Sequence, residues 1–143
     1  MEREQTPLPE IRQTVVIRAP IERVWEKVST AEGIAAWFMP NDFEPKVGHE
    51  FHVQSPFGPS PCKVTEVEPL HRISFIWDTE GWVVTFLLKE AGEHTEFTLI
   101  HGGWKHPEYI MAKAGRPAGE IRGMMNQGWA GIVEDLRRLL ENP

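Results

Sequence analysis

His101 is the residue of this chain whose type and position are most suggestive of chemistry. It follows Phe97 and Leu99 at alternating positions, so it falls on the inward side of a predicted strand. A buried imidazole needs a hydrogen-bond partner, which can be a protein group, a water molecule or a ligand oxygen. Three interpretations therefore stay open for His101: a core histidine with a protein partner, a ligand contact, and an acid–base catalyst.

The other histidines and the single cysteine form no catalytic or metal-binding pattern. His49 and His52 are three residues apart in a predicted strand, which places them on opposite faces. The sequence contains no His-Glu-x-x-His motif and no second cysteine, so a zinc site lacks ligands. Cys62 could act as a nucleophile only beside a histidine and a cation, and an unreactive thiol is the simpler interpretation. We expect no metal and no cofactor, and because the residues identify no catalytic constellation, a binding protein is favoured over an enzyme.

The elements that must position these residues begin with a strand and two short helices. Residues 11–17 alternate between apolar and polar, as a half-buried strand does. Pro20 suits the first turn of a helix, and apolar residues recur at helical spacing from there to Val28. Ser29 and Glu32 are spaced as a capping box, which predicts a second short helix that ends near Pro40.

The middle of the chain predicts an antiparallel meander of strands over 50–54, 62–68, 72–77, 82–89 and 95–101. Segment 105–119 is a candidate lid, with one or two helical turns between Pro107 and Gly115. One side of the meander should point inward, toward a closing helix. Its members are Ile73, Phe75, Trp77, Trp82, Val84, Phe86, Leu88, Phe97, Leu99 and His101.

A long amphipathic helix is predicted at the end of the chain. Its apolar residues step by three and four, from Ile121 through Met125 and Trp129 to Leu140. It also contains glycines at 119, 123, 128 and 131, which either allow the sheet or a ligand to approach closely or lie partly in a frayed N-terminal turn. Of three methionines near the predicted pocket, Met111, Met124 and Met125, each could contact a ligand or fill a gap in the core.

The order of these elements predicts the α+β class: a curved antiparallel sheet of about six strands around the C-terminal helix, with two short helices after the first strand. A strongly curved sheet and a straight helix cannot fit together along their whole length. We therefore expect a cavity between them, lined by apolar and aromatic side chains that suit aromatic or polycyclic ligands.

Three bulky residues in a row, Trp37, Phe38 and Met39, cannot share one core face, because neighbours on a helix point about 100° apart. We predict that Trp37 packs in the core while Phe38 or Met39 faces the cavity mouth. The alternative is that all three cover the open end of the sheet. The candidate ligand-binding residues are Trp37, Phe38, Met39, Phe51, Phe75, Trp77, Val84, Phe86, Leu99, His101, Met111, Met125 and Trp129.

Length, charge and composition limit the classes of function. The 143 residues suit one domain over 1–143, with 1–9 as a flexible leader. A net charge of −6 argues against binding to a nucleic-acid backbone. The sequence shows no signal peptide and no apolar run of about 20 residues, so we expect no membrane insertion. With a single cysteine, these features predict a cytoplasmic protein.

Four segments resemble the START-like (SRPBCC) superfamily, in its branch named for activators of the heat-shock-protein ATPase (AHSA-like). They read VVIRAPIERVWEKVSTAEGIAAWF, VTEVEPLHRISFIWD, EFTLIHGGW and QGWAGIVEDLRRLLE, and the likeness spans about Ile11 to Glu141. The resemblance implies a helix-grip fold with a deep cavity. Members of the superfamily bind sterols, lipids, plant aromatics or polyketides there, and a few catalyse reactions in it.

Three functions follow as expectations. The first is a protein that binds a small hydrophobic or aromatic, lipid-like or polyketide-like molecule between the sheet and the closing helix. The second is an enzyme of the cyclase or hydrolase kind that uses His101 as acid or base. The third is a partner of a chaperone ATPase, although eukaryotic activators of that branch carry an additional domain for which this chain has no room.

Overall fold

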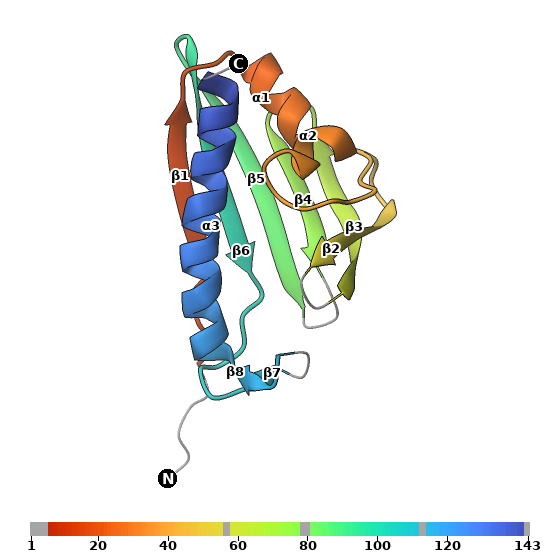
Figure 1. The fold of residues 1–143 in the computed structure, drawn as a ribbon, viewed down its shortest axis with the longest axis vertical. Coiled ribbons are helices and arrows are strands. Elements are labelled where there is room, and N and C mark those ends of the chain that lie inside the picture. The colour runs from red at the N-terminus through yellow and green to blue at the C-terminus, as the bar shows by residue number, and fades with distance from the viewer. Residues whose placement is uncertain (1–5, 56–57, 78–80, 112–113, 142–143) are drawn as a thin grey trace.

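The computed structural model describes residues 6–55, 58–77, 81–111 and 114–141. Its centre is a curved six-stranded sheet in the order β1-β6-β5-β4-β3-β2, with every neighbouring pair antiparallel (Figure 1). The fold is therefore the predicted α+β arrangement. The strands are β1 (Ile11–Ile17), β2 (Glu50–Ser55), β3 (Gly58–Glu68), β4 (Arg72–Trp77), β5 (Trp82–Ala91) and β6 (His94–Gly102).

Three helices are described: α1 (Ile21–Val28), α2 (Ala31–Ala35) and the long α3 (Ala118–Glu141). Figure 1 shows α3 along β1 and β6 at one side of the sheet, with α1 and α2 nearer the other strands. The side-chain amide of Gln13 on β1 donates to Asn126 Oδ1 on α3 at 2.8 Å, which ties helix and strand together. None of these helices is both long enough and apolar enough to cross a membrane.

The inward side of the meander is buried as the alternation predicts. Nine of its ten predicted residues are buried, and Trp82 is half-buried. One irregularity interrupts β3: Val64 pairs with Phe75 but Glu66 pairs with Ser74, so Thr65 is an extra residue. Such a bulge bends and twists a strand. It also explains why Val64 and Val67 both pair with inward residues of β4 although they are three positions apart.

Two local predictions were wrong. The N-cap of α2 is Thr30, whose hydroxyl accepts from the Gly33 N–H at 2.9 Å, whereas the Ser29 hydroxyl donates back to the Trp25 carbonyl. The described part of segment 105–119 contains a small hairpin rather than a helical turn, formed by β7 (Ile110–Met111) and β8 (Arg116–Pro117).

The hairpin turns Met111 into the core, where 4% of its surface is exposed. Its end is closed by Gly115, whose positive φ of 67° favours glycine and does not fit a right-handed helix. The Ala118 N–H donates to the Tyr109 carbonyl at 2.7 Å, so the segment is joined to the start of α3.

The surroundings of the α3 glycines argue against one of the two interpretations, close approach of the sheet. A Cβ on Gly123, Gly128 or Gly131 would meet nothing within 4 Å, so no described residue approaches the helix closely there. At Gly119 alone a Cβ would touch a neighbour, Pro107 at 3.4 Å. Close approach of the sheet therefore does not account for the three later glycines.

Candidate functional site

His101 is fully buried on β6, and its imidazole has one hydrogen-bond partner among the described residues. The Trp129 indole N–H on α3 donates to its Nδ1 at 2.9 Å. Burial, helped by the charge of Arg122, lowers the pKa of His101 from 6.5 to about 3. The imidazole is therefore neutral at neutral pH, and because Nδ1 accepts a hydrogen bond, its proton resides on Nε2.

Four of the six tryptophans of the chain surround this imidazole, and we call the five residues the tryptophan–histidine cluster. Trp82 lies edge-on to His101 with ring centroids 4.6 Å apart, and Trp104 lies 4.7 Å away. Trp77 and Trp129 complete the ring at 5.6 and 5.9 Å. Trp77, Trp82 and His101 lie on β4, β5 and β6, Trp104 follows β6, and Trp129 lies on α3. The cluster therefore forms only when the sheet and the helix are packed together.

The register of the sheet explains how the cluster forms. Trp77 and Trp82 are directly opposite each other across β4 and β5, and their rings meet at 5.3 Å. After β6 the chain turns at Gly103, which has a φ of +84° and would place a Cβ 2.1 Å from the Gly81 carbonyl oxygen. Only glycine fits this turn. The turn brings the Trp104 indole N–H to the His101 carbonyl, to which it donates at 2.9 Å.

Two buried nitrogen atoms of the cluster, Trp77 Nε1 and His101 Nε2, have no hydrogen-bond partner among the described residues. Both carry a proton: an indole nitrogen always donates, and the tautomer of His101 places its proton on Nε2. A buried donor without an acceptor costs about 1–3 kcal/mol of stability. Such a pair, on rings 5.6 Å apart, is the chemically most unusual feature of the described core.

A second group of rings lies beside the first and consists mainly of phenylalanines, with His49 stacked on Phe51 at 6.2 Å. Successive centroid distances are 5.2 to 5.7 Å from Phe43 through Phe51 and Phe75 to Phe86. Trp37 meets this group edge-on, at 5.4 Å from Phe86, and its indole donates to the Lys27 carbonyl at 2.8 Å. The phenylalanine cluster consists of Trp37, Phe43, Phe51, Phe75, Phe86 and Phe97.

Phe38 joins the two clusters. In the tryptophan–histidine cluster it stacks on Trp129 at 5.1 Å and lies edge-on to Trp77 at 5.8 Å, and in the phenylalanine cluster its ring lies 6.1 Å from that of Trp37. Its side chain is half-buried, and so is that of Met39, whereas Trp37 is 4% exposed. The prediction that Trp37 packs in the core is confirmed, and the expectation that Phe38 or Met39 faces a cavity mouth stays a prediction.

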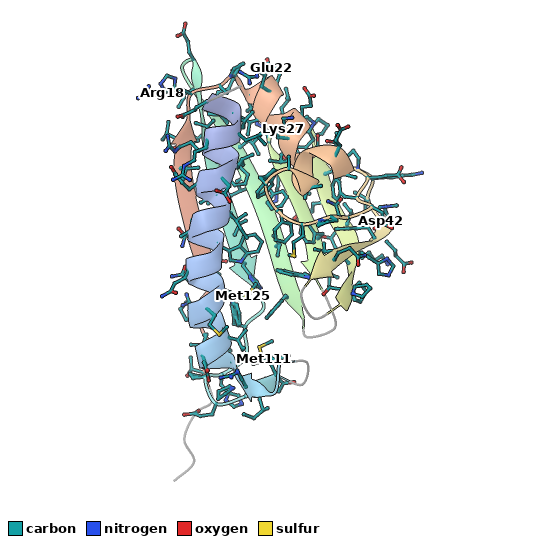
Figure 2. The ribbon with its side chains drawn as sticks, in the orientation of Figure 1. Arg18, Glu22, Lys27, Asp42, Met111 and Met125 are labelled. Carbon is teal, nitrogen blue, oxygen red and sulfur yellow. The ribbon has the colours of Figure 1, made fainter. Side chains whose placement is uncertain are left out.

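The thirteen predicted ligand-binding residues thus fall into separate places. Phe38, Trp77, His101 and Trp129 come together; Trp37, Phe51, Phe75 and Phe86 belong to the phenylalanine cluster. Val84 and Leu99 are buried core residues, and Val84 pairs with His101. Figure 2 shows Met111 and Met125 toward the end of the molecule where β7 and β8 lie. Met124 is 58% exposed, so its predicted place near the pocket is wrong.

Two members of the tryptophan–histidine cluster are missing from the predicted site residues. Trp82 lies on the inward side of β5, as the alternation of residues in the sequence predicted, but it was not included among the candidate ligand-binding residues. Trp104 follows Gly102 and Gly103 directly, and a glycine pair after a strand is a signal for a chain reversal. Such a reversal returns the next side chain toward the end of the strand, which is how Trp104 reaches His101.

The described surface also has an open hollow of about 510 Å³ beside the edge strand β2. Its lining is polar in part, and Asp42 Oδ1 there accepts from the backbone N–H of His52. Within the described ranges no three histidine, cysteine or carboxylate side chains gather closely enough to hold a metal. The residues around the hollow are Pro40, Asn41, Asp42, His52, Gln54 and Pro59.

Comparisons with known proteins agree with this architecture. Residues 18–141 match the family model described as Activator of Hsp90 ATPase homolog 1-like protein. The solution structure of the Bacillus halodurans protein BH1534 is 52% identical with a TM-score of 0.89, over 95% of this chain and 99% of that one. No curated protein matches the sequence.

Two further solved structures are 28% identical to this chain. The Mesorhizobium loti protein MLL2253 has a TM-score of 0.73, over 90% of this chain and 96% of its own. DynU16, a protein of the dynemicin biosynthetic locus, has a TM-score of 0.75, over 95% of this chain but 48% of its own. The chain therefore resembles about half of DynU16.

Proposed function

This chain belongs to the family of Activator of Hsp90 ATPase homolog 1-like proteins, with its START-like fold, and we propose that it binds a small hydrophobic or aromatic molecule between the sheet and α3. The residues proposed to contact it are those of the tryptophan–histidine cluster, with Met125 nearer the end where β7 and β8 lie, and Phe38 is the ring that it would displace. Family membership alone assigns no ligand, because one fold serves many functions.

The position of Phe38 is the observation that carries the proposal. Its ring bridges the helix and the sheet, yet it belongs to neither, because it follows the short helix α2. It is also half-buried, while the rings on both sides of it, Trp77 and Trp129, are buried. A ligand ring that took its place would keep the same stacked and edge-on contacts, so the exchange would lose little packing.

The neutral state of His101 favours binding over acid–base catalysis. A general base works best when its pKa lies near the working pH, and the pKa of His101 is lowered to about 3. The enzyme hypothesis therefore has little support from this residue. The likeness to DynU16, a protein of a biosynthetic locus, is compatible with a small-molecule ligand.

Partnership with a chaperone ATPase stays a hypothesis that the described surface does not favour. It predicts a broad apolar patch outside the pocket. The exposed large apolar residues come instead from different segments, and only Ile76 and Val83 among them are cross-strand partners. The others are Val16, Val47, Ile110 and Met124.

A nuclear magnetic resonance titration with bicyclic aromatics, sterols and fatty acids tests the proposal. We expect at least one compound to bind saturably and to shift the resonances of Phe38, Trp77, His101 and Trp129. Phe38→Ala should bind a bicyclic aromatic about tenfold more tightly, since the ring that competes for its place is gone. Ile76→Ala, on the outer face of the sheet, is the matched control and should leave the affinity unchanged. Saturable binding that maps only to the hollow beside β2, or none at all, would contradict the proposal.

A further inference from the structure

We propose that the ligand carries a neutral carbonyl oxygen and that the N–H groups of Trp77 and His101 hold this oxygen. The inference rests on the proposed function and adds the polar group that an otherwise apolar molecule must have. It begins from two buried donors on neighbouring rings, for which the described residues supply no acceptor.

The other polar atoms of the cluster that form hydrogen bonds do so within the protein, which leaves the N–H groups of Trp77 and His101 without acceptors among the described residues. The Trp129 indole donates to His101 Nδ1, and the Trp104 indole donates to the His101 carbonyl. Both interactions stay within the protein and fix the imidazole in one orientation. Because Nδ1 accepts a hydrogen bond, the imidazole proton is on Nε2. His101 Nε2 and Trp77 Nε1 are therefore two buried donors, surrounded by aromatic rings, that have no acceptor among the described residues.

The charges near the cluster point to the same kind of ligand. Arg122, on α3, is the charged group that acts on His101, and it makes the surroundings favourable for an electronegative atom. Its guanidinium is already bound to the carbonyl oxygens of Pro9 and Glu10, at 2.8 and 3.3 Å. Those two bonds hold the guanidinium at the N-terminal segment, and burying a carboxylate without a directly paired cation is costly. A ketone-type oxygen satisfies both donors without that cost.

A matched pair of probes tests the inference: 1-tetralone and tetralin, which share a bicyclic skeleton and differ in one carbonyl oxygen. We expect the wild-type protein to bind 1-tetralone at least tenfold more tightly than tetralin, which corresponds to about 1.4 kcal/mol. The Trp77 indole and His101 Nε2 proton resonances should move downfield with 1-tetralone and not with tetralin.

Two variants remove one donor each. Trp77→Phe keeps an aromatic ring without the N–H. His101→Asn keeps an acceptor near the Nδ1 position for Trp129 and loses the Nε2 donor. In both, the preference for 1-tetralone should fall below threefold while tetralin affinity changes little; if His101→Asn does not fold, Trp77→Phe carries the test. Trp25→Phe, on α1 and outside the cluster, is the control and should keep the full preference.

The outcomes separate this inference from the proposed function. Equal affinity for both probes, with shifts at Phe38 and Trp129, overturns the carbonyl inference and leaves the ligand-binding proposal standing. A long-lived water in contact with both N–H protons while 1-tetralone is bound also overturns it, because water is then their acceptor. If neither these probes nor the wider lipophile panel binds near the cluster, the proposed function fails and the inference fails with it.

Discussion

The hydrogen bond between Trp129 and His101 is the contact through which helix and sheet define the candidate site. It joins residues 28 positions apart in the sequence and is fully buried. It fixes the tautomer of the imidazole and thereby decides which of its nitrogens is free to act. Stability and ligand binding should therefore respond together when it is removed.

Trp129→Phe should lower the free energy of unfolding by at least about 2 kcal/mol, because it leaves His101 Nδ1 buried without a donor and makes the ring smaller. Denaturant unfolding measures this loss. A long-range proton–nitrogen spectrum should also show the proton of His101 distributed over both ring nitrogens. Trp25→Phe, half-buried on α1, should cost less and leave the tautomer unchanged. An unaltered tautomer in Trp129→Phe would contradict the assigned role of the bond.

The low pKa of His101 also predicts a dependence of stability on pH. Its pKa is about 3 when folded and about 6.5 when unfolded, so between these values the unfolded chain binds more protons. The contribution is fully present above pH 6.5 and is lost as the pH falls toward 3. At about 1.4 kcal/mol per pKa unit, the total is on the order of 5 kcal/mol.

The difference in pH dependence between wild type and His101→Asn isolates this contribution from that of the carboxylates. Unfolding free energies measured from pH 7 to pH 4 should fall more steeply in the wild type. Ile76→Ala, on the outer face of the sheet, changes no ionisable group and should keep the wild-type slope. Parallel curves for wild type and His101→Asn would show that the imidazole is not held neutral by burial.

The parity of β6 was enough to predict that His101 points inward, but it could not identify its partner. Trp129 lies on a helix, and the rotation of that helix against the sheet is not encoded in the strand pattern. The same limit explains why Trp104 was missed as a site residue, since its side chain reaches His101 only through the turn at Gly103.

At the level of elements, α3 carries glycines that its packing does not require. Gly128 is exposed, and a Cβ there would meet open space. Gly33 in α2 is the opposite case, because a Cβ would come within 2.7 Å of the Glu26 carbonyl oxygen. The two positions form a matched pair for the same substitution.

Gly128→Ala should raise the free energy of unfolding by about 0.5–1 kcal/mol, since alanine restricts the unfolded chain and suits a helix interior better. Gly33→Ala should lower it by more than about 2 kcal/mol, because the backbone of α1 and the start of α2 must move apart. Thermal unfolding of both variants checks the signs. A loss of stability in Gly128→Ala would indicate that something covers this part of α3 in solution.

The element order was predictable because each segment carries its own period, of two in the strands and 3.6 in the helices. The bulge at Thr65 was not, because an extra residue in a strand is visible only once the partner strand is in place. The hairpin of β7 and β8 was missed for a related reason: its short strands pair over two residues each, too few to show a period.

Over the whole molecule, the sheet order predicts where the structure opens first. β5 and β6 each have strands on both sides, whereas β2 lies at the edge of the sheet. The preceding loop contacts β2 through the bridge of Asn41 with Val53 and through bonds from the Gln54 N–H to the Pro40 carbonyl and from the His52 N–H to Asp42 Oδ1. Backbone amides paired on both sides open only with large-scale unfolding.

Native-state hydrogen exchange should therefore find the amides of β5 and β6 protected up to the global free energy of unfolding. Those of β2, α2 and the short hairpin should exchange earlier, through local openings. If β2 instead exchanges as slowly as β6, a partner or second copy covers that edge in solution, and a concentration series of the same measurement would reveal it.

The curved sheet and its long helix were predictable as a class, yet what fills the space between them was not. Phe38 and Trp37 enter that space from the segment after α2, so their rings depend on a connection whose path no periodicity describes. Assignment to one domain and to the cytoplasm stays a prediction.

The contacts of the N-terminal residues have a practical consequence. The Leu8 N–H donates to the Lys105 carbonyl, and the carbonyls of Pro9 and Glu10 hold the Arg122 guanidinium. Shortening the chain to Ile11 would remove both carbonyls that bind the Arg122 guanidinium, the charge that helps to lower the pKa of His101. Recombinant versions meant for ligand screening should therefore keep residues 6–10 and carry any tag ahead of them.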